Sequence, residues 1–211
     1  YYRSEGEIEM KKINFSIGNK EENKSSKICD SILECVKNTD KKFDNIVIFN
    51  IGSDRVIFDS IGPFVGTFLL EDMTNYLLDI PVKIIGTLED TAQALNLEKK
   101  YNSIKNIRNT LIIAVDASVC ASLDMEYNIF ISNEPIRPGS YLGKSLPRIG
   151  DISIKLGVYL GDEKIYDITS IKTVKLGEIY SSAKEISKGI LNSIEEIDVD
   201  YIGGRMKERI S

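Results

Sequence analysis

Histidine is absent from this chain of 211 residues. Its absence excludes the Ser-His-Asp and Cys-His nucleophile systems, the H-E-x-x-H zinc site and every imidazole acid or base. Any chemistry that the protein performs must therefore use carboxylates, amines, hydroxyls, backbone groups or a bound ion.

Cysteine is scarce, and its three copies, Cys29, Cys35 and Cys120, form no C-x-x-C pair. An odd number of cysteines without metal or redox spacing fits a reducing compartment, so we expect a cytoplasmic protein. Cys120 is a conceivable nucleophile. With no histidine to lower its pKa, however, a buried and inert thiol is the favoured interpretation.

Long apolar runs and long blocks of one charge are also missing. The longest apolar runs, such as 46–51 and 111–115, are far shorter than the roughly 20 residues that a membrane helix needs, so we expect no membrane span. The 27 basic and 32 acidic residues give a net charge of −5 and form no stripe that could track phosphates. We therefore expect no nucleic-acid partner.

What is present is the composition of a globular protein, with 42% hydrophobic and 28% charged residues. We expect residues 1–24 to form a polar N-terminal arm with at most a short strand at 13–17. Residues 25–197 should form a single α/β domain, and residues 198–211 a C-terminal tail.

Strand and helix patterns alternate along this domain. The alternation predicts right-handed βαβ crossovers and hence a three-layer α/β/α fold, in which helices flank a mostly parallel, twisted sheet. The expected strands cover 46–51, 82–85, 111–115, 127–131 and 151–160. The first expected helix begins after a cap at Ser25 or Ser26. The other expected helices cover 64–78, 91–107 and 174–194.

Asp59 and Asp116 follow two strands that we expect to be neighbours. In an open α/β sheet, ligands bind beyond the carboxyl ends of the strands where the strand order reverses. With the order 2-1-3, the loops after 46–51 and 111–115 face each other, which brings Asp54 and Asp59 within reach of Asp116. Two close carboxylates share a proton and can activate water. The same oxygens could instead hold Mg²⁺ or Ca²⁺, and the sequence leaves both readings open.

Each of these residues also has a structural alternative. Asp59 could cap the helix that begins near Pro63, although the residue just before that proline is the better cap position. Asp116 could merely terminate a strand. Asp54 could form an ion pair or a turn with its neighbour Arg55.

The Pro- and Gly-containing segment 133–150 is a long loop, and loops of this length in a compact domain are usually functional or mobile. Lys144 and Arg148 in it could contact carbonyl or carboxylate groups of a substrate. Solvated loop charges are the structural alternative.

Taken in order, several stretches resemble the YyaC-type sporulation proteins, which are similar to the germination protease of spores and, more remotely, to hydrogenase maturation proteases. The resemblance covers about residues 46–190. The matching stretches are Ile51-Gly-Ser-Asp-Arg55, Asp59-Ser-Ile-Gly-Pro-Phe-Val-Gly66, Gly86-Thr-Leu88, Leu95-Asn-Leu97, Val115-Asp-Ala117, Pro138-Gly139 and Leu146-Pro-Arg-Ile-Gly-Asp-Ile-Ser153.

The resemblance implies a peptidase-like α/β/α fold, a sporulation role in the mother cell or forespore, and self-association. The germination protease is similar to an aspartic-type peptidase, and its two functional aspartates correspond to Asp59 and Asp116. Hydrogenase maturation proteases use the same two positions and a histidine to bind a metal, and that histidine has no counterpart here. The chain also departs from the family at Val56-Ile57-Phe58, an apolar lip before Asp59, and around Gln93, where family members usually carry a histidine.

The leading hypothesis is a peptidase of sporulation or germination in which water activated by Asp59 and Asp116 hydrolyses an amide bond. Its substrate would be a peptide or small spore protein, held by Asp54, Arg55, Lys144 and Arg148. No cofactor is required, although a divalent cation on the two aspartates is one alternative. The other alternative is a non-catalytic module that binds a peptide or protein on the same fold.

Overall fold

The computed structural model of this protein describes residues 11–39, 41–139, 146–160 and 174–210, with side chains as far as residue 201. It contains a six-stranded mixed sheet in the order β1-β5-β6-β4-β2-β3. The strands are β1 (Asn14–Ile17), β2 (Asn45–Asn50), β3 (Val82–Ile85), β4 (Thr110–Val119), β5 (Ile129–Ser132) and β6 (Ile152–Val158).

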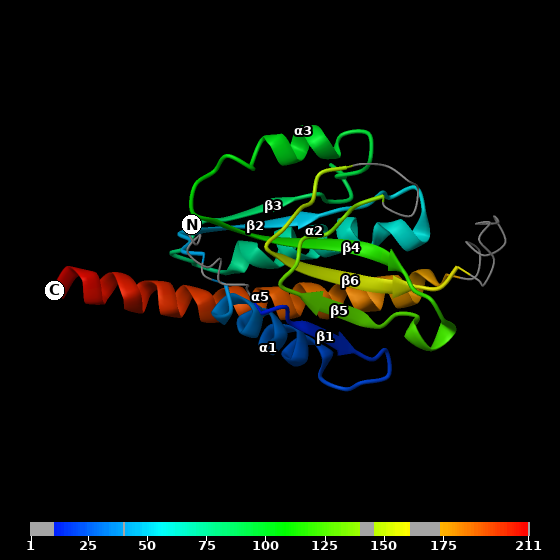
Figure 1. Cartoon of the computed structure of the whole chain (residues 1–211), viewed down its shortest axis with the longest axis horizontal. Coiled ribbons are helices and arrows are strands. Elements are labelled where there is room, and N and C mark those ends of the chain that lie inside the picture. Colours follow the sequence, from blue (N-terminus) through cyan, green and yellow to red (C-terminus); the bar gives the residue numbers. More distant parts are fainter. Residues whose placement is uncertain (1–10, 40, 140–145, 161–173, 211) are drawn as a thin grey trace, which may run out of the picture.

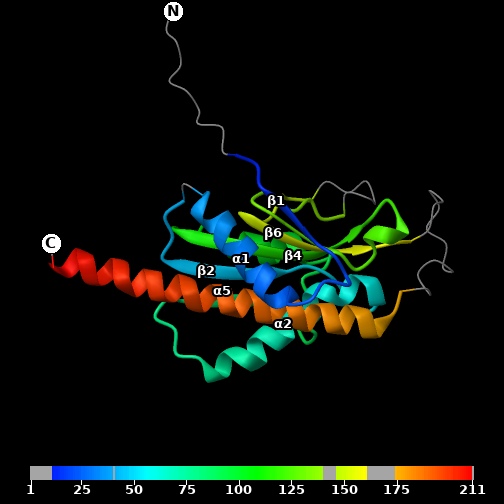
Figure 2. The ribbon, with the colours of Figure 1, turned by 90° about the horizontal axis from the view of Figure 1, so that it is seen from below.

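Helices cover both faces of this sheet (Figure 1). On one face, α1 (Lys24–Lys37), α2 (Ile61–Asp72) and α5 (Leu176–Ile210) lie side by side, as Figure 2 shows from below. The short helix α3 (Leu97–Asn102) covers the other face. The expected α/β architecture of helices around a mostly parallel sheet is thus confirmed, with β1 and β5 as its antiparallel strands.

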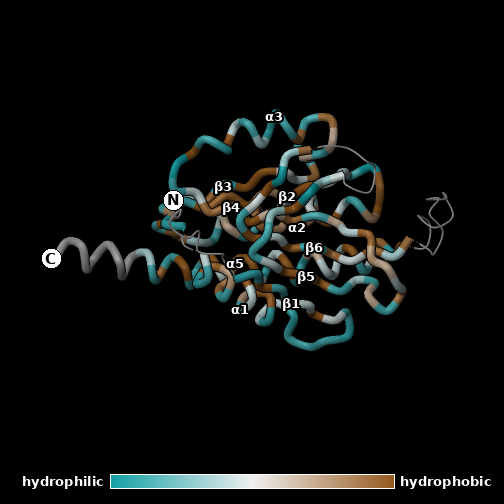
Figure 3. The backbone as a smooth tube through the Cα atoms, viewed as in Figure 1, coloured by the Kyte–Doolittle hydropathy of each residue, from teal (hydrophilic) through white to brown (hydrophobic). Residues whose placement is uncertain are grey.

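The central strands are buried on both sides, which explains their continuous apolar runs. Along β4, Ile113 and Val115 pack into the larger core beneath α1, α2 and α5, whereas Ile112 and Ala114 pack into the smaller core beneath α3. In Figure 3 the strands are accordingly hydrophobic and α3 is mostly hydrophilic. The two faces of the sheet therefore carry different residues and contribute to different cores.

The expected order 2-1-3 of the first three central strands is confirmed. Strand β2 lies between β3 and β4 and runs parallel to both. The connection from β2 to β3 passes through α2 on one face, and the connection from β3 to β4 passes through α3 on the other. The carboxyl ends of β2 and β4 therefore meet at a point where the strand order reverses, the usual position of a ligand site.

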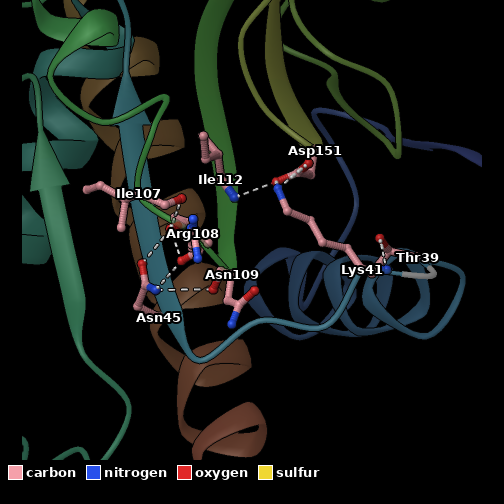
Figure 4. Close-up of polar contacts among 9 residues, drawn as sticks. Thr39, Lys41, Asn45, Ile107, Arg108, Asn109, Ile112 and Asp151 are labelled. Carbon is pink, nitrogen blue, oxygen red and sulfur yellow. Dashed lines mark hydrogen bonds and ion pairs between the residues drawn. The ribbon is translucent and has the colours of Figure 1, made fainter.

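Side-chain hydrogen bonds tie the opposite, amino ends of the strands together (Figure 4). The Asn45 amide donates to the Asn109 carbonyl (3.1 Å), and Asp151 accepts the Ile112 N–H (2.8 Å) and pairs with Lys41 (2.7 Å). These contacts hold β2, β4 and β6 in register at the end of the sheet away from the candidate site.

Several element boundaries differ from expectation. Strand β4 does not stop at residue 115 but continues to Val119, because β6 offers it pairing partners beyond the end of β2. The helix expected over 91–107 is confined to Leu97–Asn102. The Asn96 side chain bonds the Thr91 carbonyl and the Gln93 N–H (both 2.9 Å), and such local bonds compete with helix formation.

The third difference is the last helix, which was expected over 174–194 and in fact runs to Ile210. Ile194 and Ile197 continue its buried stripe, and the Asp198 carboxylate accepts the Ile80 N–H at 2.7 Å. Part of the segment expected as a tail is therefore docked on the domain. The short strand expected at 13–17 in the N-terminal arm is present as β1, which pairs with β5 at the sheet edge.

The start of α1 also differs, because the helix begins at Lys24, before either expected cap. The Glu185 carboxylate of α5 accepts the Ser25 N–H at 2.9 Å. A side chain from another helix thus takes the role that sequence reasoning assigned to a local serine.

Candidate active site

Asp116 lies in the part of β4 that extends beyond β2. It continues the face of Ile112 and Ala114, so its side chain is on the α3 side of the sheet. Only 8% of the residue is exposed, and its carboxylate accepts the Ala117 N–H at 2.8 Å. Its register partner in β6 is Lys155. Asp116 is therefore a strand residue and not, as expected, the residue after the strand.

Asp59 reaches the same place from the end of β2. It lies in a short 3₁₀ helix, Ile57–Ser60, which leads into α2. Its backbone carbonyl accepts the Ser53 N–H at 2.9 Å, and its own N–H donates to Val56 at 3.0 Å. Since α2 begins at Ile61 with Ser60 as the preceding residue, Asp59 does not cap that helix. The structural alternative for Asp59 is removed.

Gly52 allows this close approach. Its φ of +140° is one that other residues rarely adopt, and a Cβ atom there would lie 2.0 Å from the Asp59 carbonyl oxygen. The loop after β2 can fold against the 3₁₀ helix only without that atom. A single glycine therefore sets the position of Asp59 relative to the sheet.

Replacing Gly52 by alanine should lower the free energy of unfolding by about 2 kcal/mol or more, because the change combines a strained backbone with a steric clash. Gly177 is the matched control, since a Cβ atom there meets nothing within 4 Å. Gly177→Ala in helix α5 should be neutral or slightly stabilising. Chemical denaturation of the two variants measures the difference, and equal midpoints would contradict this role of Gly52.

Burial raises the pKa of both carboxyl groups, and the charge of Asp59 adds to the rise in the pKa of Asp116. Burial raises the pKa of Asp59 to about 6, with the Ser53 amide opposing part of the shift. The pKa of Asp116 is raised well above its ordinary value, first by burial and then by the negative charge of Asp59, while the Ala117 amide and Lys155 lower it. The two carboxyl groups are therefore electrostatically coupled, because the charge of Asp59 disfavours ionisation of Asp116.

The pair opens into a cavity of about 520 Å³ at the carboxyl ends of the strands. Its floor comes from the sheet and its rim from the segments 134–139 and 146–148. The charged residues in the described part of its lining are Lys12, Asp59, Asp116, Glu134, Arg137, Arg148 and Lys155. A cavity of this size accommodates part of a peptide.

The four residues expected to hold a substrate have different positions. Arg148 lines the cavity, on a segment joined to the other side of the loop by paired hydrogen bonds between Ile136 and Ile149 (2.8 and 3.0 Å). Asp54 and Arg55 are exposed on the loop after β2, outside the cavity lining. Lys144 lies outside the described residues.

The apolar lip is mostly turned inward. Phe58 is buried and Val56 packs against the larger core, so only Ile57, 39% exposed, faces solvent to a substantial extent. Gln93, where family members usually carry a histidine, lines the cavity. Cys120 is half-buried outside the lining, and burial raises the pKa of its thiol, which agrees with an inert role.

Sequence reasoning missed several charged residues of the cavity, above all Lys155. A signal for it was present, since Lys155 is the only charged residue between Ile152 and Leu160 in an otherwise apolar strand. The pairing of β6 with β4, which places it beside Asp116, was not visible in the sequence. The missed rim residues are Lys12, Glu134 and Arg137.

The donor set is small for a metal. Within the part of the chain that the structure describes, no three His, Cys, Asp or Glu side chains gather in a group that could hold a metal ion. Asp59 and Asp116 would supply only two carboxylates.

The described helices include none that is long and apolar enough to cross a membrane.

Comparison with known proteins confirms the resemblance to YyaC-type proteins. A protein of Bacillus subtilis (strain 168), described as uncharacterized protein YyaC, is 31% identical over 148 residues, which cover 69% of this chain and 67% of the relative. Residues 16–189 match the model of a family described as a protein of unknown function, DUF1256. This match covers the end of β1, strands β2 to β6 and both aspartates, and the chain belongs to the DUF1256 family.

Proposed function

We propose that this protein is a peptidase in which Asp59 and Asp116 activate water to hydrolyse an amide bond. The observation that carries the proposal is a pair of coupled, raised-pKa carboxyl groups in one cavity at the strand-order reversal. Structural ion pairs can also perturb pKa values. Two carboxyl groups whose pKa burial raises destabilise the fold, however, which favours a functional reason. The sporulation setting rests on the resemblance to the germination protease alone.

The environments of the two groups assign their roles. Asp116 is the more deeply buried, and the charge of Asp59 raises its pKa further. In this mechanism the pair shares one proton, which Asp116 holds, and Asp59 is the carboxylate. Asp59 takes a proton from water as the water oxygen attacks the amide carbonyl. Asp116 then gives its proton to the leaving nitrogen as the C–N bond breaks. The products are a carboxylic acid and an amine. The pair again carries a single proton, now on Asp59, which returns to Asp116 before the next turnover.

The purified protein should cleave peptides from a pool of unfolded proteins, and mass spectrometry of the new termini would identify the sites. The alternative of a binding module predicts retention of peptides without new termini. The alternative of metal-assisted hydrolysis predicts activity that is lost with a chelator and restored by a divalent cation. Cleavage that persists in the chelator supports the metal-free mechanism.

The pH dependence of cleavage is a second test. Since the active pair carries one proton, kcat/KM should rise as the pH increases through about 6, where the first proton leaves the pair. Initial rates from about pH 4 to 9 measure this profile. An optimum near pH 3 to 4, where an isolated aspartate titrates, would contradict a shared proton.

A further inference from the structure

Lys155 has an unusual position for a lysine. It lies inside β6, flanked by the buried residues Ile154 and Leu156, and is itself half-buried. Its register partners are Asp116 in β4 and Phe130 in β5. Because side chains alternate along a strand, Lys155 is on the same face as Asp116 and lines the same cavity.

The Lys155 ammonium group has no direct partner in the part of the chain that the structure describes. Among the described residues, no hydrogen bond and no ion pair within 4.0 Å involves it. The other cationic side chains of the cavity are either paired with a carboxylate or exposed on the rim. Lys12 pairs with Glu134 at 2.6 Å, and Arg137 and Arg148 are exposed on the rim. Lys155 is therefore the cation on the cavity floor that is available to a bound molecule.

The charge of this lysine matches the state of the aspartate pair. With one shared proton, Asp59 and Asp116 carry one negative charge, which the Lys155 ammonium balances. The positive charge of Lys155 attracts the ionised form of Asp116 and so lowers the pKa of Asp116, whereas burial and the charge of Asp59 raise it. The charged groups that face the pair from elsewhere in the lining are Lys12, Glu134, Arg137 and Arg148. A neutral triad thus forms the floor of the cavity.

We propose that Lys155 is the third functional residue of the site and that its ammonium group binds the oxygen of the amide carbonyl under attack. The inference rests on the proposed peptidase function. As water adds to the carbonyl carbon and Asp59 takes the proton, the C=O electron pair moves onto this oxygen, where the positive charge of Lys155 stabilises it. When that pair re-forms the C=O bond, the nitrogen leaves with the proton of Asp116.

The test replaces Lys155 by methionine, which keeps the length of the side chain without its charge. Removing one group that stabilises an oxyanion lowers kcat by a factor of about 10²–10³, and we expect this loss in kcat with a KM close to that of the wild type. Lys155→Arg keeps the charge, and its kcat should be at least about tenfold higher than that of Lys155→Met. If Lys155→Met does not fold, Lys155→Gln repeats the test with a neutral polar head.

Lys83 is the matched control. It is an exposed lysine in β3, on the same face of the sheet as Val47, its partner in β2, but outside the cavity lining. Lys83→Met removes the same charge from a strand of the same sheet and should leave the cleavage rate unchanged. If only Lys155→Met loses cleavage rate, the loss results from removing the charge inside the cavity and not from removing a lysine from the sheet.

The full pH–rate profile separates binding of the oxygen from an indirect effect on the aspartate pair. Lys155 lowers the pKa of Asp116, so loss of the lysine should move the fall of the profile, where Asp116 loses its proton, to higher pH. The rate at the variant's own optimum should stay about 100-fold low. Recovery of the wild-type rate at a shifted pH would overturn the proposal, because Lys155 would then only tune Asp116. A Lys155→Met enzyme as fast as the wild type would overturn it while the peptidase function stands. A wild-type protein that cleaves nothing overturns the peptidase function itself.

Discussion

Replacing Asp59 or Asp116 by asparagine should lower kcat/KM for peptide cleavage by a factor of about 10³ or more. Asparagine has nearly the shape of aspartate but neither accepts a proton from water nor delivers one to the leaving nitrogen. General acid–base catalysis by a positioned side chain contributes factors of about 10²–10⁴. The Ala117 N–H that Asp116 now accepts at 2.8 Å can be accepted equally by an asparagine oxygen, so the local structure should persist.

Asp72→Asn is the control, because Asp72 is exposed at the end of α2 and lies outside the cavity lining. It should cleave at the wild-type rate. The double variant of Asp59 and Asp116 should be hardly slower than either single variant, since residues that act as a unit give non-additive losses. Wild-type turnover in both single variants would remove the pair from the mechanism, whatever the controls show.

The same two substitutions should stabilise the fold at neutral and higher pH. The Asp59 pKa rises from an ordinary value of 3.8 to about 6 on folding, so the native state binds the proton more tightly than the unfolded chain. Stability must then fall as the pH rises from about 4 through 6. Since Asp59 keeps part of its surface in solvent, we expect Asp59→Asn to raise the free energy of unfolding at about pH 8 by about 2 kcal/mol.

Asp116→Asn should act in the same direction, because burial also raises the pKa of Asp116 on folding. At about pH 3, where both carboxyl groups are protonated in the folded and unfolded states, wild type and variants should differ little. Urea denaturation at several pH values measures the difference, with Asp72→Asn as the control that should follow the wild type. Variants that are less stable than the wild type at about pH 8 would show that the ionised pair stabilises the fold.

These two predictions describe one trade-off. An enzyme site that holds carboxyl groups out of water gains acid–base chemistry near neutral pH and loses folding stability there. Loss of cleavage together with a gain in stability in the same variant would be hard to reconcile with a structural role for the pair.

Much of the fold is predictable from local patterns. The segment 46–51, apolar except at Asn50, lies in β2 with a final bridge at Ile51. The alternation of strands and helices predicts the parallel centre of the sheet, whose order is the common 2-1-3 that we assumed. That order places Asp59 and Asp116 together, which is why two residues 57 positions apart could be named as a pair. The resemblance to YyaC-type proteins independently selects the same two aspartates.

Other features depend on contacts between distant segments. Strand β4 continues through Asp116 only because β6 pairs with it, and α1 begins early because Glu185 of another helix accepts an amide of its first turn. The exposure of Asp54 and Arg55 could not be predicted either, because the sequence of a loop does not show whether a residue faces a cavity or solvent.

The sequence by itself determined which groups are available for chemistry, because a chain without histidine offers no imidazole acid, base or metal ligand, and it predicted the alternation of strands and helices. Only the tertiary structure decided the charge state of the site. Burial, the repulsion between Asp59 and Asp116, and the nearby Lys155 act through space, and their strength depends on distances and solvent exposure that no local pattern encodes.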